Sequence, residues 1–168
     1  MSKIEEDSEL KPITFACEES LGLLHEQIAE QTLDISQWSS IQTHAVLPGI
    51  SNAEFEVKTP QIVGSRFRVT STDGSSHVEE IVKWEPDRQV RLHMREFSPP
   101  LSRLATGFYE TWEFSRIGRD TRVSRSFELH ATSRLSRPLL WLISFLLKKA
   151  IARHLRQMRE SSVGARVT

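Results

Sequence analysis

Apolar and polar positions alternate between Phe108 and Leu129, and this pattern predicts two long strands that form a hairpin. On the first strand the inward set is Phe108, Glu110, Trp112 and Phe114. On the second strand it is Val123, Arg125, Phe127 and Leu129. A two-residue turn at Gly118-Arg119 places Trp112 opposite Arg125, with Glu110 one diagonal away. An apolar face that contains an acid and a base indicates a lined cavity rather than a dry core.

Further strands and helices follow from alternation, turn residues and helix caps. The predicted order is a strand at 13–17, two short helices capped by Ser20 and Asp34, and strands near 54–58, 65–71, 76–84 and 89–97. Two prolines make 98–107 a loop, and Pro138 starts a long helix that ends near Arg159.

The sequence Asp73-Gly74 is a strong hairpin signal. A two-residue turn there places Val69 opposite Val78 and Phe67 opposite Glu80. The inward face of the 76–84 strand then holds Val78, Glu80, Val82 and Trp84. The histidines at 77, 93 and 130 fall on the opposite, solvated face.

This order of elements predicts an α+β domain. A curved antiparallel sheet of about six to seven strands wraps around the long C-terminal helix, and two short helices follow the first strand. Residues 12–160 form a single domain, between flexible tails at 1–11 and 161–168.

Composition bounds the class of protein. The chain has 168 residues, enough for one sizeable core, and a single cysteine, so no disulfide framework is expected. The acidic N-terminus has no apolar signal-peptide core, which favours a cytoplasmic protein. Residues 1–83 carry a charge balance of −8 and residues 84–168 one of +8. Either the two halves pair across one fold, or the basic half meets phospholipid or nucleic acid.

Several local patterns, in this order, resemble the START-related helix-grip superfamily, also called SRPBCC, which includes polyketide cyclases, lipid-transfer domains and pollen-allergen-like proteins. The patterns are Trp38-Ser-Ser-Ile41, Gly64-Ser-Arg-Phe-Arg-Val69, the stretch 79–92, Tyr109-Glu-Thr-Trp-Glu-Phe114 and Gly118-Arg-Asp-Thr-Arg-Val-Ser124. The resemblance covers about residues 12–160. It implies a sheet that grips the long helix around a hydrophobic cavity, and it implies no shared catalytic motif.

Motifs for other chemistry are missing from the sequence. There is no P-loop, dinucleotide fingerprint or nucleophile elbow. The six histidines lack the spacing of a zinc site, so no metal or cofactor is expected. The basic strand positions lack interleaved aromatic residues, which argues against nucleic acid. Cys17 is expected as a buried apolar residue rather than a nucleophile.

Two functions remain. The first is a carrier or receptor for a lipid, an isoprenoid or a polyketide-like molecule, whose cavity is lined by Phe67, Val69, Glu80, Val82, Trp84, Leu92, Met94, Phe108, Glu110, Trp112, Arg125 and Phe127. The second is a cyclase or dehydratase that acts on a polyketide-like substrate in the same cavity. The carrier is preferred, and no catalytic residue is assigned. Glu110 and Arg125 either form an internal ion pair that only fixes packing or orient the ligand's polar group.

The start of the long helix, 139–147, is apolar all round, yet it is too short to span a bilayer. It is either covered by loops or touches a membrane surface or a partner. In the second case Leu101, Leu104, Trp141 and Phe145 form an apolar lip at the cavity mouth. Its basic rim would comprise Arg103, Arg134, Arg137, Lys148 and Lys149. The sequence leaves the oligomeric state open.

Overall fold

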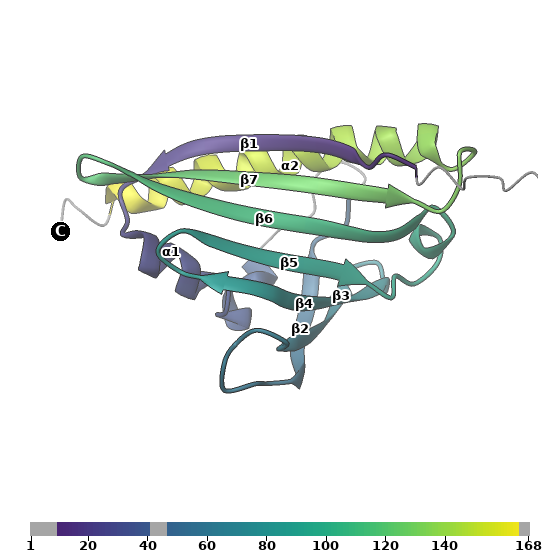
Figure 1. Ribbon diagram of the computed structural model, residues 1–168, viewed down its shortest axis with the longest axis horizontal. Helices are drawn as coiled ribbons and strands as arrows, with labels where there is room; N and C mark the ends of the chain where they lie inside the picture. Colours follow the sequence, from purple (N-terminus) through teal and green to yellow (C-terminus); the bar gives the residue numbers. More distant parts are fainter. Residues whose placement is uncertain (1–9, 41–46, 165–168) are drawn as a thin grey trace, which may run out of the picture.

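A seven-stranded antiparallel sheet and one long helix make up most of the structure. The computed structural model describes residues 10–40 and 47–164. The strands are β1 (Ile13–Leu21), β2 (Ile50–Val57), β3 (Arg66–Ser71), β4 (Ser76–Glu85), β5 (Gln89–Arg95), β6 (Ala105–Ile117) and β7 (Asp120–Ala131). The helices are α1 (His25–Gln31), α2 (Arg137–Gly164) and the short 3-10 helices η1 (Ile35–Ser40) and η2 (Leu101–Arg103). The strand order is β1-β7-β6-β5-β4-β3-β2, and α2 runs along β1 and β7 (Figure 1).

The predicted fold class is confirmed, and so is the central hairpin. Ile117 pairs with Asp120, so Gly118 and Arg119 form the two-residue turn between β6 and β7. Gly118 has a φ of +60°, which only glycine adopts at little cost. Trp112 lies opposite Arg125, as the alternation predicts.

The region after β1 differs from the prediction of two short helices. β1 continues to Leu21, because Ser20 pairs with Arg122 instead of capping a helix. The first helix begins at His25, and the second is the 3-10 helix η1. Pairing with β7 therefore outweighs the local capping preference of Ser20.

The register of the β3–β4 hairpin is shifted by one residue from the prediction. Val69 pairs with His77, and Phe67 pairs with Glu79. The loop has three residues, since the amide of Ser71 donates to the carbonyl of Ser75 at 2.8 Å and Gly74 has a φ of +84°. A one-residue slip moves every side chain to the other face, so Glu79 and not Glu80 faces α2.

A bulge in β4 changes which residues of this strand lie on the inner face of the sheet. The register between β4 and β5 shifts between Ile81 and Lys83, and Trp84 then pairs with Val90. The bulge returns Trp84 to the face of Ile81 and leaves Val82 exposed on the outer face. Val78 and Val82 are therefore not inward neighbours of Trp84.

The ends of several elements also differ from the predictions. The segment predicted as a loop contains η2, and β6 begins within it at Ala105. β5 ends at Arg95, and α2 continues past Arg159 to Gly164. Most of the predicted N-terminal tail and the last residues of the C-terminal one lie outside the described residues.

The core consists of three apolar clusters rather than one. The first includes Cys17, Leu21, Ile28, Val90, Trp112 and Leu155. The second includes Ile13, Phe97, Phe108, Phe127, Leu129 and Leu140. The third includes Trp38, Phe67, Val69, Ile81 and Leu92. Glu110 lies where they meet, because it pairs with Leu92 and Phe127 and is two residues from Trp112 on the same face.

Candidate functional site

The inner face of the sheet, toward α2, carries most of the predicted ligand-binding residues. The register places on it Phe67, Val69, Trp84, Leu92, Met94, Phe108, Glu110, Trp112, Arg125 and Phe127. Glu80 and Val82 lie on the outer face for the register reasons given above. There Glu80 accepts a hydrogen bond of 2.8 Å from Nη2 of Arg95.

A buried ion pair joins β6 and β7 at the centre of this face. Arg125 Nε donates to Glu110 Oε1 at 2.7 Å, and Arg125 Nη2 contacts the same oxygen. Glu110 is 3% exposed and Arg125 is 5% exposed. The guanidinium also lies 4.1 Å from the ring centroid of Trp112, which adds a cation–π contact. The diagonal pairing read from the sequence thus occurs in the structure.

His154 on α2 completes the arrangement from the helix side. Its Nδ1 lies 2.8 Å from Nη1 of Arg125. A guanidinium can only donate, so Nδ1 is the acceptor and the neutral ring carries its proton on Nε2. Burial and then the charge of Arg125 lower the pKa of His154 to about 4, which keeps the ring neutral near pH 7. Sheet and helix are therefore joined by a charged hydrogen-bond chain.

A second acid lies on the same inner face. Glu79 on β4 is buried, and its Oε1 is 3.0 Å from Nε2 of His77. Burial raises the pKa of Glu110 most strongly, Arg125 opposes this effect, and the charge of Glu79 raises the pKa further. Two buried carboxyl groups thus lie close enough for the charge of one to act on the other, and Arg125 contacts Glu110, an arrangement that favours binding a proton or a hydrogen-bond donor.

Three of these polar residues were missed at the sequence level. Glu79 and His77 were assigned to the wrong face because the β3–β4 loop was read as two residues long. His154 had a usable signal: together with Leu147, Ile151 and Met158 it forms a stripe at helical spacing on the buried side of α2. The stripe is hard to recognise in the sequence because Lys and Arg residues are interleaved with it after Leu147.

The indole nitrogen of Trp112 lies beside the hydrogen-bond chain of Glu110, Arg125 and His154. Trp112 Nε1 is buried and makes no hydrogen bond of good geometry among the described residues, although the indole is close enough to Glu110 to lower the pKa of that carboxyl. A buried donor without an acceptor costs about 1–3 kcal/mol, so an acceptor from a ligand or a water would lower the free energy here.

Two surface depressions among the described residues lie away from the hydrogen-bond chain of Glu110, Arg125 and His154. One is lined by Ile35, Ser36, Ser51, Asn52 and Ala53. The other is lined by Glu18, Glu19, Ser20, Ile117 and Arg122. Neither includes a predicted ligand-binding residue.

The described residues offer no metal site and no membrane-spanning helix. No group of three His, Cys, Asp or Glu within 10–40 and 47–164 could hold a metal ion. Over the same part of the chain, none of the helices combines the length and apolar character needed to cross a bilayer. Cys17 is buried, and burial raises the pKa of its thiol.

Comparison with solved structures shows that the chain has the START-related helix-grip fold. The Zhui aromatase/cyclase from Streptomyces sp. R1128 superposes with a TM-score of 0.70 at 10% identity, over 94% of this chain and 96% of that one. A START superfamily protein from Mycobacterium smegmatis gives 0.62 at 11% identity, over 86% and 98%. Ginseng major latex-like protein 151 from Panax ginseng superposes with a TM-score of 0.59 at 16% identity, over 86% of this chain and 98% of that one. No protein-family model and no curated protein matches the chain.

Proposed function

We propose that this protein binds a hydrophobic small molecule, such as a lipid, an isoprenoid or a polyketide-like compound, between the inner face of the sheet and α2. It acts as a carrier or receptor, and Glu110 and Arg125 orient the ligand's polar group. The observation that carries the proposal is the position of this ion pair, buried where three separate apolar clusters meet.

The energetics of burial support a ligand-orienting role over packing alone. A buried ion pair is often no more stabilising than apolar residues of the same volume, so stability alone does not account for it. Beside the ion pair lie Trp112 Nε1, which has no hydrogen bond of good geometry among the described residues, and a second buried acid, Glu79. A ligand with an apolar body and one hydrogen-bonding end matches both the lining and these groups.

Native mass spectrometry of the chain purified from its own host tests the proposal. We expect a co-purifying small molecule, released on denaturation. Binding of 1-anilinonaphthalene-8-sulfonate to the emptied protein then serves as a probe for variants. Met94→Trp fills space on the inner face and should weaken binding at least tenfold. Val82→Trp adds the same side chain on the outer face and is the matched control.

Two results would count against the carrier. One is the lack of any retained molecule together with no probe binding to the folded protein. The other is equal weakening by Met94→Trp and Val82→Trp, since the site would then lie elsewhere. Thermal unfolding of both variants shows whether they are folded.

An enzyme of the cyclase or dehydratase type is the second candidate. Its basis is the burial of Glu110, which raises the pKa of the carboxyl in the direction that a general acid needs, while the contact with Arg125 opposes this shift. Glu110→Gln and Glu79→Gln would then abolish turnover of a linear poly-β-ketone while probe binding persists. A protein that binds this substrate without changing it is a carrier. Cytoplasmic location stays a prediction, to be tested by cell fractionation.

A further inference from the structure

The outward side of α2 exposes large apolar side chains in its first three turns. Leu135, just before the helix, is 93% exposed, Trp141 is 61% exposed and Phe145 is 47% exposed; Leu139 and Leu142 are also exposed. We call Leu135, Leu139, Trp141, Leu142 and Phe145 the apolar patch. Contiguous exposed apolar side chains of this size mark interaction sites in soluble proteins.

The patch has an ordered aromatic centre. The rings of Trp141 and Phe145, one helical turn apart, are nearly parallel, with centroids 6.4 Å apart. The ammonium of Lys149 lies 4.5 Å from the ring centroid of Phe145. Along this stripe an indole, a phenyl ring and a cation therefore follow one another. This order suits the interface between the acyl chains and the headgroups of a lipid bilayer. Tryptophan and lysine side chains at such an interface place their apolar part among the acyl chains and their polar end among the headgroups.

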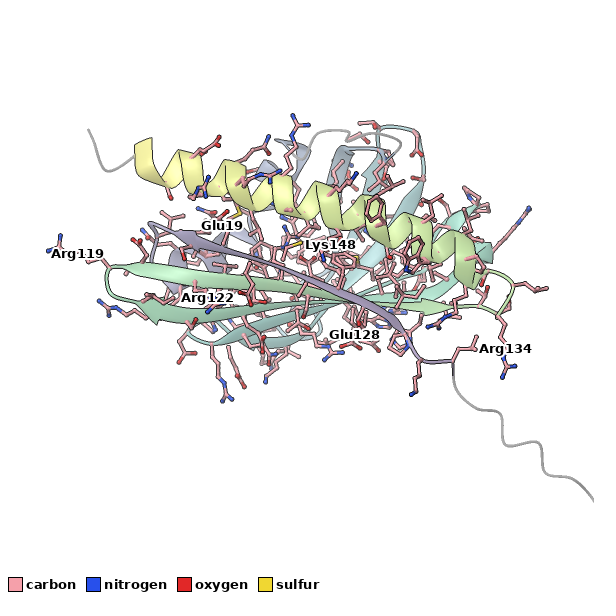
Figure 2. The ribbon with its side chains drawn as sticks, turned by 90° about the horizontal axis from the view of Figure 1, so that it is seen from above. Glu19, Arg119, Arg122, Glu128, Arg134 and Lys148 are labelled. Atoms are coloured by element: carbon pink, nitrogen blue, oxygen red, sulfur yellow. The ribbon has the colours of Figure 1, made fainter. Side chains whose placement is uncertain are left out.

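The segment that carries the patch has charges of one sign. Between Thr132 and Arg159 the sequence contains no Asp or Glu, and its basic residues are Arg134, Arg137, Lys148, Lys149, Arg153, Arg156 and Arg159. In the described ranges no carboxylate lies within ion-pair distance of Arg134, Lys148 or Lys149. Figure 2 shows Arg134 at the end of the molecule opposite Arg119, in the turn that joins β7 to α2.

The loop before β6 is hydrogen-bonded to Thr132, in the turn that leads from β7 to α2. The amide of Thr132 donates to the carbonyl of Leu104 at 2.9 Å, and the hydroxyl of Thr132 donates to the carbonyl of Arg103 at 2.8 Å. Leu101 and Leu104 are half-buried, and Arg103 is exposed. Trp141 is not covered by the loop, so the reading in which loops bury the helix start is wrong for this residue.

We propose that the apolar patch docks on an anionic membrane surface. Trp141 and Phe145 enter the interface, and Lys148 and Lys149 remain at the level of the lipid phosphates. An apolar surface with basic neighbours fits this occupant, because attraction to anionic lipid and burial of apolar area add together. A second copy of the chain fits poorly, since docking patch to patch would bring two basic rims together. This docking is independent of whether the inner face holds a ligand.

Co-sedimentation of the full chain with vesicles tests the proposal. We expect binding to vesicles of phosphatidylcholine with 30% phosphatidylserine, and at least tenfold weaker binding to phosphatidylcholine alone. Raising the salt from 0.1 M to 1 M shortens the screening length from about 10 Å to about 3 Å and should release the protein.

Paired variants separate the two contributions. Trp141→Ser/Phe145→Ser should weaken binding at least tenfold. Lys148→Gln/Lys149→Gln should weaken it about thirtyfold, since each cation near an anionic surface contributes about 1 kcal/mol. The β6–β7 hairpin at the opposite end offers matched controls, because exposed Ile117 lies there beside Arg116 and Arg119. Ile117→Ser and Arg116→Gln/Arg119→Gln should leave binding unchanged.

Three results would overturn the proposal. The chain does not bind anionic vesicles at low salt; the hairpin variants weaken binding as much as the patch variants do; or sedimentation velocity shows a dimer that Trp141→Ser/Phe145→Ser converts to a monomer. Probe binding by the inner face is measured without vesicles, so a failure of docking and a failure of the carrier function can be told apart.

Discussion

Replacing Arg125 with methionine should strongly destabilise the protein, because it leaves Glu110 buried without its partner. Both side chains are almost fully buried, and two nitrogens of the Arg125 guanidinium, Nε at 2.7 Å and Nη2, contact the same oxygen of Glu110. Removing one member of a buried pair costs about 3–5 kcal/mol. In a chain of this length that loss lowers the Tm by about 6–20 °C. Arg125→Met/Glu110→Gln removes both charges and should recover most of the stability.

The size of this loss should depend on pH in a defined direction. Burial already raises the pKa of Glu110, and removal of Arg125 raises it further. A carboxyl whose pKa is higher in the folded than in the unfolded state stabilises the fold when protonated, and that stability is lost as pH rises. The difference in the free energy of unfolding between Arg125→Met and Arg125→Met/Glu110→Gln should therefore be largest near pH 8. It should decrease toward pH 5, by at most about 1.4 kcal/mol per pH unit.

Urea unfolding followed by circular dichroism at pH 5 and pH 8 measures this gap. Arg95→Met is the matched control, since it breaks the partly exposed pair with Glu80 on the outer face and should cost less than about 1 kcal/mol. The reasoning is refuted if the double variant is as unstable as Arg125→Met at both pH values, because the loss would then come from packing. A loss below about 1 kcal/mol for Arg125→Met would refute it as well.

Three further predictions follow from single contacts. His154 should stay neutral, with its proton on Nε2, down to about pH 4, and nitrogen-detected NMR can show this. Because its pKa is lower in the folded than in the unfolded state, the free energy of unfolding should fall as pH drops from 6.5 toward 4. His154→Phe should make the free energy of unfolding less dependent on pH in this range. If the protein is a carrier, Glu79→Gln should shift the affinity of the inner face for the probe without abolishing binding, whereas Glu80→Gln should leave the affinity unchanged; equal effects would contradict the β3–β4 register. Gly74→Ala should cost about 1 kcal/mol in urea unfolding through backbone strain alone, since nothing lies within 4 Å of an added Cβ.

Local patterns predicted the elements well where neighbours in sequence decide the outcome. The alternation from Phe108 to Leu129 and the turn at Gly118 led to the β6–β7 hairpin and its register. The Glu110–Arg125 pair followed directly, because cross-strand neighbours are set once a register is known. Pro138 likewise marked the first turn of α2.

Predictions failed where two local solutions differ little in energy. Asp73-Gly74 fits a two-residue turn and a three-residue loop almost equally, and the sheet as a whole selects the latter. That choice exchanges Glu79 for Glu80 on the inner face. The bulge after Ile81 then places Trp84 inward and Val82 outward, and the alternation within β4 contains no sign of it.

By itself the sequence determined the fold class, the central hairpin with its buried acid and base, and the basic, apolar character of α2. These properties depend on residue types at short spacing, so they can be read from the chain. Only the tertiary structure decided that His154 is hydrogen-bonded to Arg125, that the charge of Glu79 acts on Glu110, and that Trp141 remains exposed. Each of these outcomes depends on where α2 lies on the sheet and on the register of every strand pair between them. That placement minimises the free energy of all the contacts together, and no short stretch of sequence contains it.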